Sequence, residues 1–198
     1  MTENPTETGT DYRGMIRRAG LRLFAERGVQ GVSIAQLCRE ADIANGTFYN
    51  FYRDKSELVA EFLTETYEGL ARRLRDAEGG GGSAEAEHRR DVAIIVDFTL
   101  ANSELIRVAL RDEGARRLAE KDITRLFIGQ RTAGLMRGMR SGVYRDDIDP
   151  AMVARAEHGL MTEIIGWWLE NQDVMTREAL IDSLVTIRVR ITNGQVEE

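Results

Sequence analysis

The sequence predicts an all-α fold of about nine helices. Apolar residues recur at steps of three and four along most of the 198 residues, and no segment shows the strict alternation of a half-buried β-strand. Only Pro5 and Pro150 are prolines, so the helical periodicity between them lacks the strongest helix breaker. Several apolar stripes also begin at residue types that commonly cap helix N-termini. A helical chain of this length can bury a sizeable core.

The N-terminal part divides into a polar tail and a helical domain. Residues 1–10 are polar and acidic, and we expect them to be disordered. The domain at residues 11–58 opens with a predicted helix over residues 11–27, which Gly28 ends as a C′ residue. Two roles, a solvated helix face or contact with phosphate, are open for the four arginines off its apolar stripe. These arginines are Arg13, Arg17, Arg18 and Arg22.

Two short helices joined by a tight turn follow. Ser33 and Gln36 have the spacing of a capping box, which marks the start of the first helix. The periodicity then breaks around Asp42, a residue type that tolerates the left-handed conformation of a sharp turn. The second helix is expected over about residues 45–52, with small polar and aromatic side chains pointing outward. This pattern is typical of a helix-turn-helix.

A long helix and a glycine-rich loop come next. Asp54 and Glu57 form a second capping-box pattern, and apolar steps continue from Lys55 to Leu74. Four consecutive glycines at residues 79–82 disfavour both helix and strand, which predicts a flexible loop over residues 79–84. This loop is either a hinge between domains or a mobile connection without such a role.

Helical stripes recur throughout the second predicted domain, residues 59–198. Asp149 and Pro150 form an N-cap followed by a first-turn proline, and Thr176 opens the last helix. The stripes cover residues 92–99, 102–110, 123–139, 149–168 and 176–191.

The net charge of −6 is distributed unevenly along the chain. Residues 11–58 carry eight Arg or Lys against six Asp or Glu, which gives +2, whereas residues 1–10 carry −2 and residues 59–198 carry −6. A local positive excess favours contact with phosphate. Because the excess is small, affinity for nucleic acid has to depend on specific contacts as well as on charge.

Four stretches resemble the N-terminal domain of the tetracycline-repressor (TetR) family in order and spacing, over about residues 12–62. They are residues 24–28 (FAERG), 32–34 (VSI), 46–52 (GTFYNFY) and 55–58 (KSEL). The resemblance implies a helix-turn-helix DNA-binding domain at residues 11–58 and a helical ligand-binding and dimerisation domain at residues 59–198. Two positions depart from the family pattern. Ala44 replaces a serine N-cap, which leaves Asn45 as a possible cap, and Phe51 stands where a histidine often contacts phosphate.

The resemblance also implies which residues contact DNA. They are Ser33, Gln36, Asn45, Gly46, Thr47, Tyr49, Asn50 and Lys55. By their chemistry, the two asparagines suit adenine edges, Thr47 suits a thymine methyl group, and Tyr49 and Lys55 suit phosphate oxygens.

In the second domain, the resemblance implies a small-molecule pocket and a dimer interface formed by the last two helices. The candidates for the pocket lining are Phe98, Phe127, Tyr144 and Trp167, and the alternative for each is plain core packing. The candidates for the dimer interface are Val153, Ala156, Leu160, Leu180, Leu184 and Ile187. A homodimer can place two DNA-binding domains in successive major grooves of a palindromic operator.

The expected function is that of a ligand-responsive transcriptional repressor, released from its double-stranded DNA operator by a small hydrophobic effector. The alternative is a helical dimeric interaction protein that has lost operator binding. Catalysis is not supported, because neither His88, which we expect to be solvated, nor His158 lies in a nucleophile motif. The sequence predicts no cofactor, no metal site and no membrane span, and its single cysteine, Cys38, fits a cytoplasmic protein.

Overall fold

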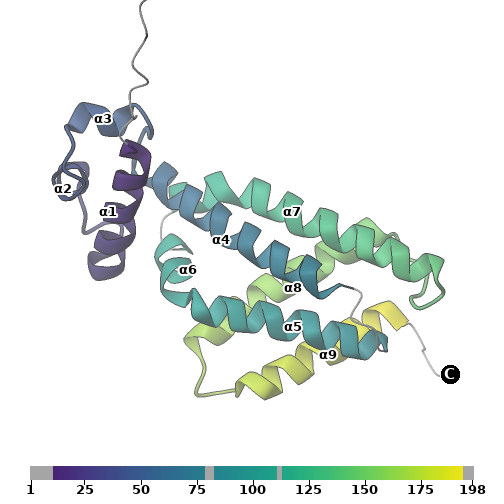
Figure 1. Ribbon diagram of the computed structural model, residues 1–198. Coiled ribbons are helices and arrows are strands. Elements are labelled where there is room, and N and C mark those ends of the chain that lie inside the picture. The colour runs from purple at the N-terminus through teal and green to yellow at the C-terminus, as the bar shows by residue number, and fades with distance from the viewer. Residues whose placement is uncertain (1–10, 79–82, 111–112, 194–198) are drawn as a thin grey trace, which may run out of the picture. The chain divides into compact units, whose positions relative to one another are not determined.

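The structure, a computed structural model, describes residues 11–78, 83–110 and 113–193. The predicted tail and the glycine run lie outside these ranges. Within them the chain is all-α, with nine helices and no strand, which confirms the predicted fold class (Figure 1). The helices are α1 (Tyr12–Arg27), α2 (Ile34–Glu40), α3 (Asn45–Tyr49), α4 (Lys55–Ala77), α5 (Ala84–Ala101), α6 (Ser103–Leu110), α7 (Glu113–Arg140), α8 (Pro150–Glu170) and α9 (Arg177–Asn193).

The chain divides into two compact units. The first contains the described residues up to Phe62 together with those from Arg107 to Leu118. The second contains residues from Leu63 to Ile106 and from Ala119 onward. Helix α4 therefore contributes its first part to the first unit and the remainder to the second.

Local chemistry sets the helix ends in the first unit as the sequence predicts. At the start of α2, Ser33 Oγ accepts from the Gln36 backbone N–H at 3.2 Å, and Gln36 Oε1 accepts from the Ser33 backbone N–H at 2.7 Å. The turn after α2 places Asp42 at φ 53°, in the left-handed region. Gly28, at φ 68°, ends α1 and donates its N–H to the carbonyl of Phe24 at 2.9 Å.

The start of α4 differs from the prediction in one detail. Asp54 caps the helix, since its Oδ1 accepts from the Glu57 backbone N–H at 2.9 Å. The Glu57 carboxylate, however, accepts from the backbone N–H of Arg53 at 2.7 Å. A capping box would direct this bond to Asp54. The carboxylate therefore fixes the residue before the cap.

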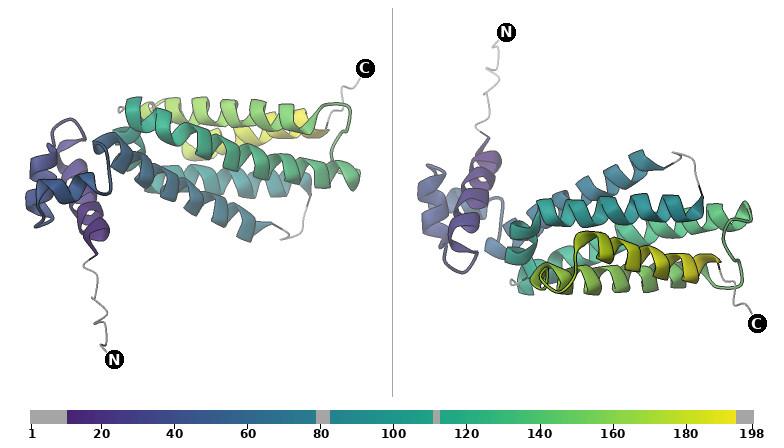
Figure 2. Two further views of the ribbon diagram at one scale, coloured as in Figure 1. Left: turned by 90° about the horizontal axis from the view of Figure 1, so that it is seen from above. Right: turned by 90° about the horizontal axis from the view of Figure 1, so that it is seen from below.

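In the second unit, α5, α8 and α9 enclose the main apolar core. Figure 2 shows α5 and α9 lying side by side, with α8 running alongside α9. The buried members of this core are Val92, Val96, Met161, Ile165, Trp168, Leu169, Leu180, Ile181, Leu184 and Val185. None of the described helices combines the length and the apolar character needed to cross a membrane.

Candidate functional site

The small core of the first unit holds α3 in place. Phe48 and Tyr52 are at most 2% exposed, and their rings contact each other with centroids 5.6 Å apart. Ile16 of α1 and Leu58 of α4 are likewise fully buried. Because Phe48 anchors α3 from the inside, the neighbouring residues of this short helix face outward.

The outward face of α3 carries most of the residues predicted to contact DNA. Asn45, Gly46, Tyr49 and Asn50 are exposed, and Thr47 is half-buried. The N-cap of α3 is Ala44, which makes no side-chain capping bond. Asn45 therefore does not serve as the cap, and it lies in the first turn of the helix. The structure brings these five residues together on one short segment.

Ser33 and Gln36 lie at the start of α2, and the capping box engages both side chains. The Ser33 hydroxyl donates to Gln36 Oε1 at 3.0 Å, in addition to the two backbone bonds. Ser33 is exposed and Gln36 is half-buried. The amide nitrogen of Gln36 is not part of the box, so this group is the one that can reach a base edge or a phosphate.

Lys55 bonds to two backbone carbonyls of its own unit, which the sequence does not predict. Its Nζ donates to the backbone carbonyl of Val29 at 2.8 Å and to that of Val32 at 2.6 Å. These two carbonyls belong to the turn between α1 and α2. An ammonium has three N–H groups, so Lys55 fixes this turn and keeps one donor for other contacts.

Two of the four α1 arginines pair with a carboxylate on α4 of the same unit. Arg13 Nη2 lies 2.6 Å from Glu61 Oε2 on α4, and Arg17 also pairs with the Glu61 carboxylate. Arg13 Nε donates to the Tyr52 hydroxyl at 3.4 Å. Partial burial alone would raise the pKa of Glu61, but the hydrogen bonds from the two arginines hold it below its usual value. These contacts join α1 to the first part of α4.

The four aromatic candidates for a ligand pocket do not converge. Phe98 is buried, with the Arg73 guanidinium 5.2 Å from its ring centroid. Phe127 lies between Tyr67 and His158, with centroids 5.9 and 6.3 Å away. Tyr144 is buried, and Trp167 is 44% exposed on the outside of α8. They therefore belong to different parts of the second unit.

A hollow of about 270 Å³ lies between α4 and α7. Its lining residues are Thr64, Glu68, Asp122, Ile123, Arg125 and Leu126. Burial raises the pKa of the Tyr67 hydroxyl and lowers the pKa of the His158 imidazole, both of which belong to the neighbouring aromatic stack. The walls of the hollow are mainly apolar, with charged side chains at its edge.

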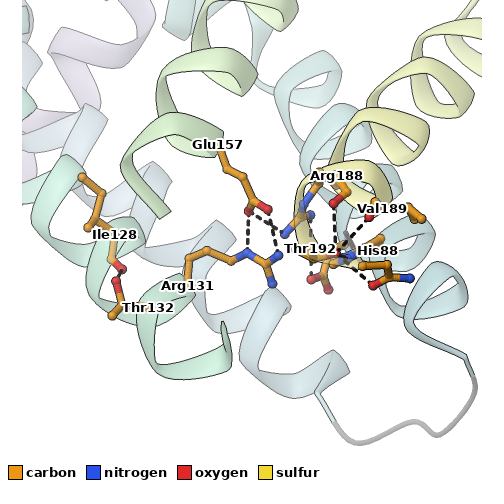
Figure 3. Close-up of polar contacts among 10 residues, drawn as sticks. His88, Ile128, Arg131, Thr132, Glu157, Arg188, Val189 and Thr192 are labelled. Atoms are coloured by element: carbon orange, nitrogen blue, oxygen red, sulfur yellow. Dashed lines mark hydrogen bonds and ion pairs between the residues drawn. The ribbon is translucent and has the colours of Figure 1, made fainter. Parts of the chain in front are cut away.

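Glu157 is the centre of a buried ionic cluster (Figure 3). It is 3% exposed and accepts two hydrogen bonds from Arg131 on α7, at 2.5 and 2.9 Å. Arg188 on α9 is 4% exposed, with Nη2 3.4 Å from Glu157 and Nη1 4.0 Å from Asp91 on α5. Burial alone would raise the pKa of Glu157, but Arg131 and Arg188 hold it below its usual value. The cluster links four helices of the second unit.

His88 is fully buried beside this cluster, so the expectation that it is solvated is wrong. Its ring stacks on Tyr144, with centroids 5.5 Å apart. The Thr192 hydroxyl lies within hydrogen-bonding distance of both His88 Nε2 and the Arg188 carbonyl, at 3.0 Å each. Burial and the charges of Arg188 and Arg131 lower the pKa of His88 to about 3. His88 is therefore neutral at physiological pH.

The sequence contains a signal for this cluster that the predictions above do not include. Glu157 lies four residues after Val153 and four before Met161, both of which are buried, and Arg188 follows the buried Leu184 at the same step. A charged residue in a core position along a helix requires a buried partner, because an isolated charge is too costly to bury. The identity of that partner depends on tertiary packing.

The predicted dimer-interface residues fall into two groups. Val153, Leu180 and Leu184 are buried in the core of their own chain, so these three do not offer a surface to a second copy. Ala156 is exposed, and Leu160 and Ile187 are half-buried. Helical periodicity explains the division. Neighbouring residues of a helix point about 100° apart, so a residue of the core face can be followed directly by one of the outer face.

Among the described residues, no three His, Cys, Asp or Glu side chains come together as a metal site would require. The only cysteine of the sequence, Cys38, is buried in α2, where burial raises the pKa of its thiol. A raised pKa makes a thiol less reactive.

Residues 16–62 match the sequence profile described as "Bacterial regulatory proteins, tetR family". The uncharacterized HTH-type transcriptional regulator YuxN of Bacillus subtilis is 24% identical over half of this chain, although the match spans only about a third (34%) of YuxN. The HTH-type transcriptional repressor KstR2 of Mycobacterium tuberculosis is 25% identical over 72% of this chain and 74% of its own length.

The fold of this chain is similar to that of FadR, a transcriptional regulator of Bacillus subtilis, in its complex with stearoyl-CoA. The TM-score is 0.71 at 18% identity, covering 89% of this chain and 97% of FadR. The similarity to FadR thus extends over both units. The similarity to the tetR profile is confined to the residues that contain most of α1, then α2, α3 and the start of α4.

Proposed function

We propose that the chain is a TetR-family regulator, a ligand-responsive transcriptional repressor that binds a palindromic operator as a homodimer. The observation that carries this proposal is the outward face of α3. Asn45, Tyr49 and Asn50 are exposed there on a segment that Phe48 anchors in the core. A short rigid helix with outward polar and aromatic groups can enter a major groove and contact base edges.

Sequence recognition rests on few side chains in this proposal. Asn50 and Asn45 pair with adenine edges, Thr47 packs against a thymine methyl, and the Tyr49 hydroxyl reaches a phosphate. Ser33 and Gln36 approach the DNA backbone. Lys55 has a double role, because two of its N–H groups fix the turn before α2 and the third can meet a phosphate oxygen.

The dimer forms through the outer faces of α8 and α9 in this proposal. On α8, Met152 is 62% exposed and Trp167 44% exposed, and the smaller residues Ala156, Gly159 and Gly166 lie between them. Ala179, Ser183 and Thr186 form a matching exposed stripe of small residues on α9. Small side chains let helices approach closely, and the two exposed apolar side chains supply area to bury.

The dimer can be tested with a single bulky charge. Gly159→Arg should convert the protein to monomers in sedimentation-velocity experiments, because the exposed site has no room for the side chain against a second copy. Glu120→Arg, a charge change at an exposed position of α7, serves as the control. Wild-type protein that sediments as a monomer at micromolar concentration contradicts the dimer.

The effector binds the second unit and is small and hydrophobic in this proposal. The similarity to FadR, whose structure contains stearoyl-CoA, supports a fatty-acyl compound, and the apolar walls between α4 and α7 offer a starting position for it. Because α4 contributes residues to both units, a shift of this helix can reach the DNA-binding unit. Release from DNA requires that the effector bind the non-binding state more tightly.

Fluorescence anisotropy with DNA flanking the protein's own gene tests the operator. We expect binding that is selective over scrambled DNA of the same composition and that weakens steeply with salt. Acyl-CoA thioesters of several chain lengths should then lower the affinity. Equal affinity for operator and scrambled DNA contradicts the repressor.

One observation favours the second candidate, a dimeric interaction protein without operator binding. Arg13, Arg17 and Lys55 are all engaged inside the first unit, which reduces the positive charge available for phosphate. The double variant Tyr49→Ala/Asn50→Ala separates the two candidates. Unchanged DNA binding in this variant supports the interaction protein, and loss of binding with unchanged thermal stability supports the repressor.

A further inference from the structure

Two of four aromatic side chains within five residues remain outside the core of the first unit. Phe48 and Tyr52 are 0% and 2% exposed, whereas Tyr49 is 58% and Phe51 41% exposed. The core needs only the first pair. Phe51 is therefore an apolar ring held at the surface, at the end of the segment whose other exposed residues are polar.

The backbone holds Phe51 firmly at this position. Its N–H donates to the Phe48 carbonyl at 3.0 Å, and the next N–H, of Tyr52, donates to the same carbonyl at 3.0 Å. The buried side chains on either side fix the chain direction. The ring of Phe51 is thus presented beside Asn50 by a rigid turn and does not depend on a mobile loop.

The chemistry of Phe51 limits what it can contact. It has no hydrogen-bond donor or charge, so it cannot bind a phosphate or read the polar edge of a base. The apolar group that distinguishes one base pair from another in the major groove is the C5-methyl of thymine. A phenyl ring beside residues that face the groove has this methyl as its natural partner.

We propose that Phe51 is a specificity-determining residue that packs against a thymine methyl group of the operator. The inference rests on the proposed operator binding and extends it to a residue outside the polar set on α3. Packing of this kind releases no counterions, so Phe51 contributes affinity that does not depend on salt. It compensates in part for the small positive excess of the first unit.

Replacement of thymine by deoxyuridine removes the methyl group alone, which makes it the sharpest probe. Each operator duplex carries one such replacement. At one position of each half-site the replacement should weaken binding of the wild-type protein about fourfold, because one methyl group is no longer buried in the complex. Phe51→Ala should bind the unmodified operator about fourfold more weakly and should be indifferent to deoxyuridine at that position. Its salt dependence should equal that of the wild type.

Two variants control the experiment. Phe51→Tyr keeps the ring and should keep the sensitivity, whereas Thr47→Ser removes a different methyl and should change the response at a different thymine. Circular dichroism melts check that Phe51→Ala folds, as its exposure predicts. If deoxyuridine affects wild type and Phe51→Ala equally at every position, the role of Phe51 is refuted while operator binding stands. If wild-type protein shows no selective DNA binding, both proposals are refuted.

Discussion

The outward face of α3 and the cluster around Glu157 are both rich in polar groups, but these groups face opposite surroundings. Asn45, Tyr49 and Asn50 are exposed to solvent, so their hydrogen-bonding capacity is available to a partner. Glu157 and Arg188 are almost fully enclosed, Arg131 is largely so, and the charged groups of the three face one another. Polarity at a surface can serve recognition, whereas polarity in a core must be satisfied internally.

Changes to the two regions should therefore have different consequences. A substitution on α3 should alter DNA affinity and leave the free energy of unfolding nearly unchanged. A substitution in the cluster should lower the free energy of unfolding and alter DNA affinity only through the fraction of folded protein. Lys55 and Phe51 belong to neither class, since Lys55 is polar but internally bonded and Phe51 is apolar but exposed.

Glu157→Ala should have the largest effect on stability. It leaves the guanidinium groups of Arg131 and Arg188 buried without their common partner, which should cost about 3–5 kcal/mol. Urea denaturation followed by circular dichroism measures the loss. Glu163→Ala, at an exposed position of the same helix, should change stability by less than about 0.5 kcal/mol.

A triple variant tests whether the charges themselves matter. Replacement of the whole cluster by Arg131→Met, Glu157→Leu and Arg188→Met removes the unpaired charges and should recover much of the lost stability. If the triple variant is less stable than Glu157→Ala, the cluster acts through shape or hydrogen bonding beyond its charges.

Mild acid should destabilise the protein through His88. The pKa of His88 is about 3 in the folded protein, below its ordinary value of 6.5. The unfolded chain therefore binds a proton that the folded protein excludes, and stability is full above pH 6.5 and falls as the pH drops below it. Between pH 6.5 and 5 the free energy of unfolding should fall by roughly 2 kcal/mol, because the uptake of one proton on unfolding changes it by about 1.4 kcal/mol per pH unit.

Urea melts across this pH range measure the effect. His88→Phe keeps a ring against Tyr144 and should flatten the dependence, although its stability at pH 7 should be lower because the bond to Thr192 is lost. Burial also lowers the pKa of His158, so His158→Phe is the control variant. It should keep most of the dependence of the free energy of unfolding on pH. An identical slope in wild type and His88→Phe contradicts the assignment.

Asn50→Ala tests the other side of the comparison. Loss of an adenine contact should weaken operator binding at least tenfold, about 1.4 kcal/mol, with no change in melting temperature. The variant should also discriminate less between the operator and a duplex changed at that adenine. Equal discrimination by the two proteins indicates that Asn50 contacts only the DNA backbone.

The fold and most of α3's surface could be predicted because they depend on short-range chemistry. Ser33 with Gln36, Asp42, and Asp149 with Pro150 each determine a helix end or turn within four residues. The burial of His88 could not be predicted, since its partner Thr192 lies 104 residues away. The same limit applies to Lys55, whose carbonyl partners are more than twenty residues distant and carry no side-chain signature.

Lys55→Met should have the smallest effect, and it decides to which region Lys55 belongs. Two carbonyls, of Val29 and Val32, lose their charged donor, so the first unit should lose about 1 kcal/mol of stability. If the ammonium also neutralises a phosphate, the slope of log affinity against log salt should fall by about 1 per subunit. Loss of stability with an unchanged slope identifies Lys55 as purely internal, like Glu157. A reduced slope with unchanged stability makes it a surface residue like Asn50, and contradicts the two carbonyl bonds as its main role.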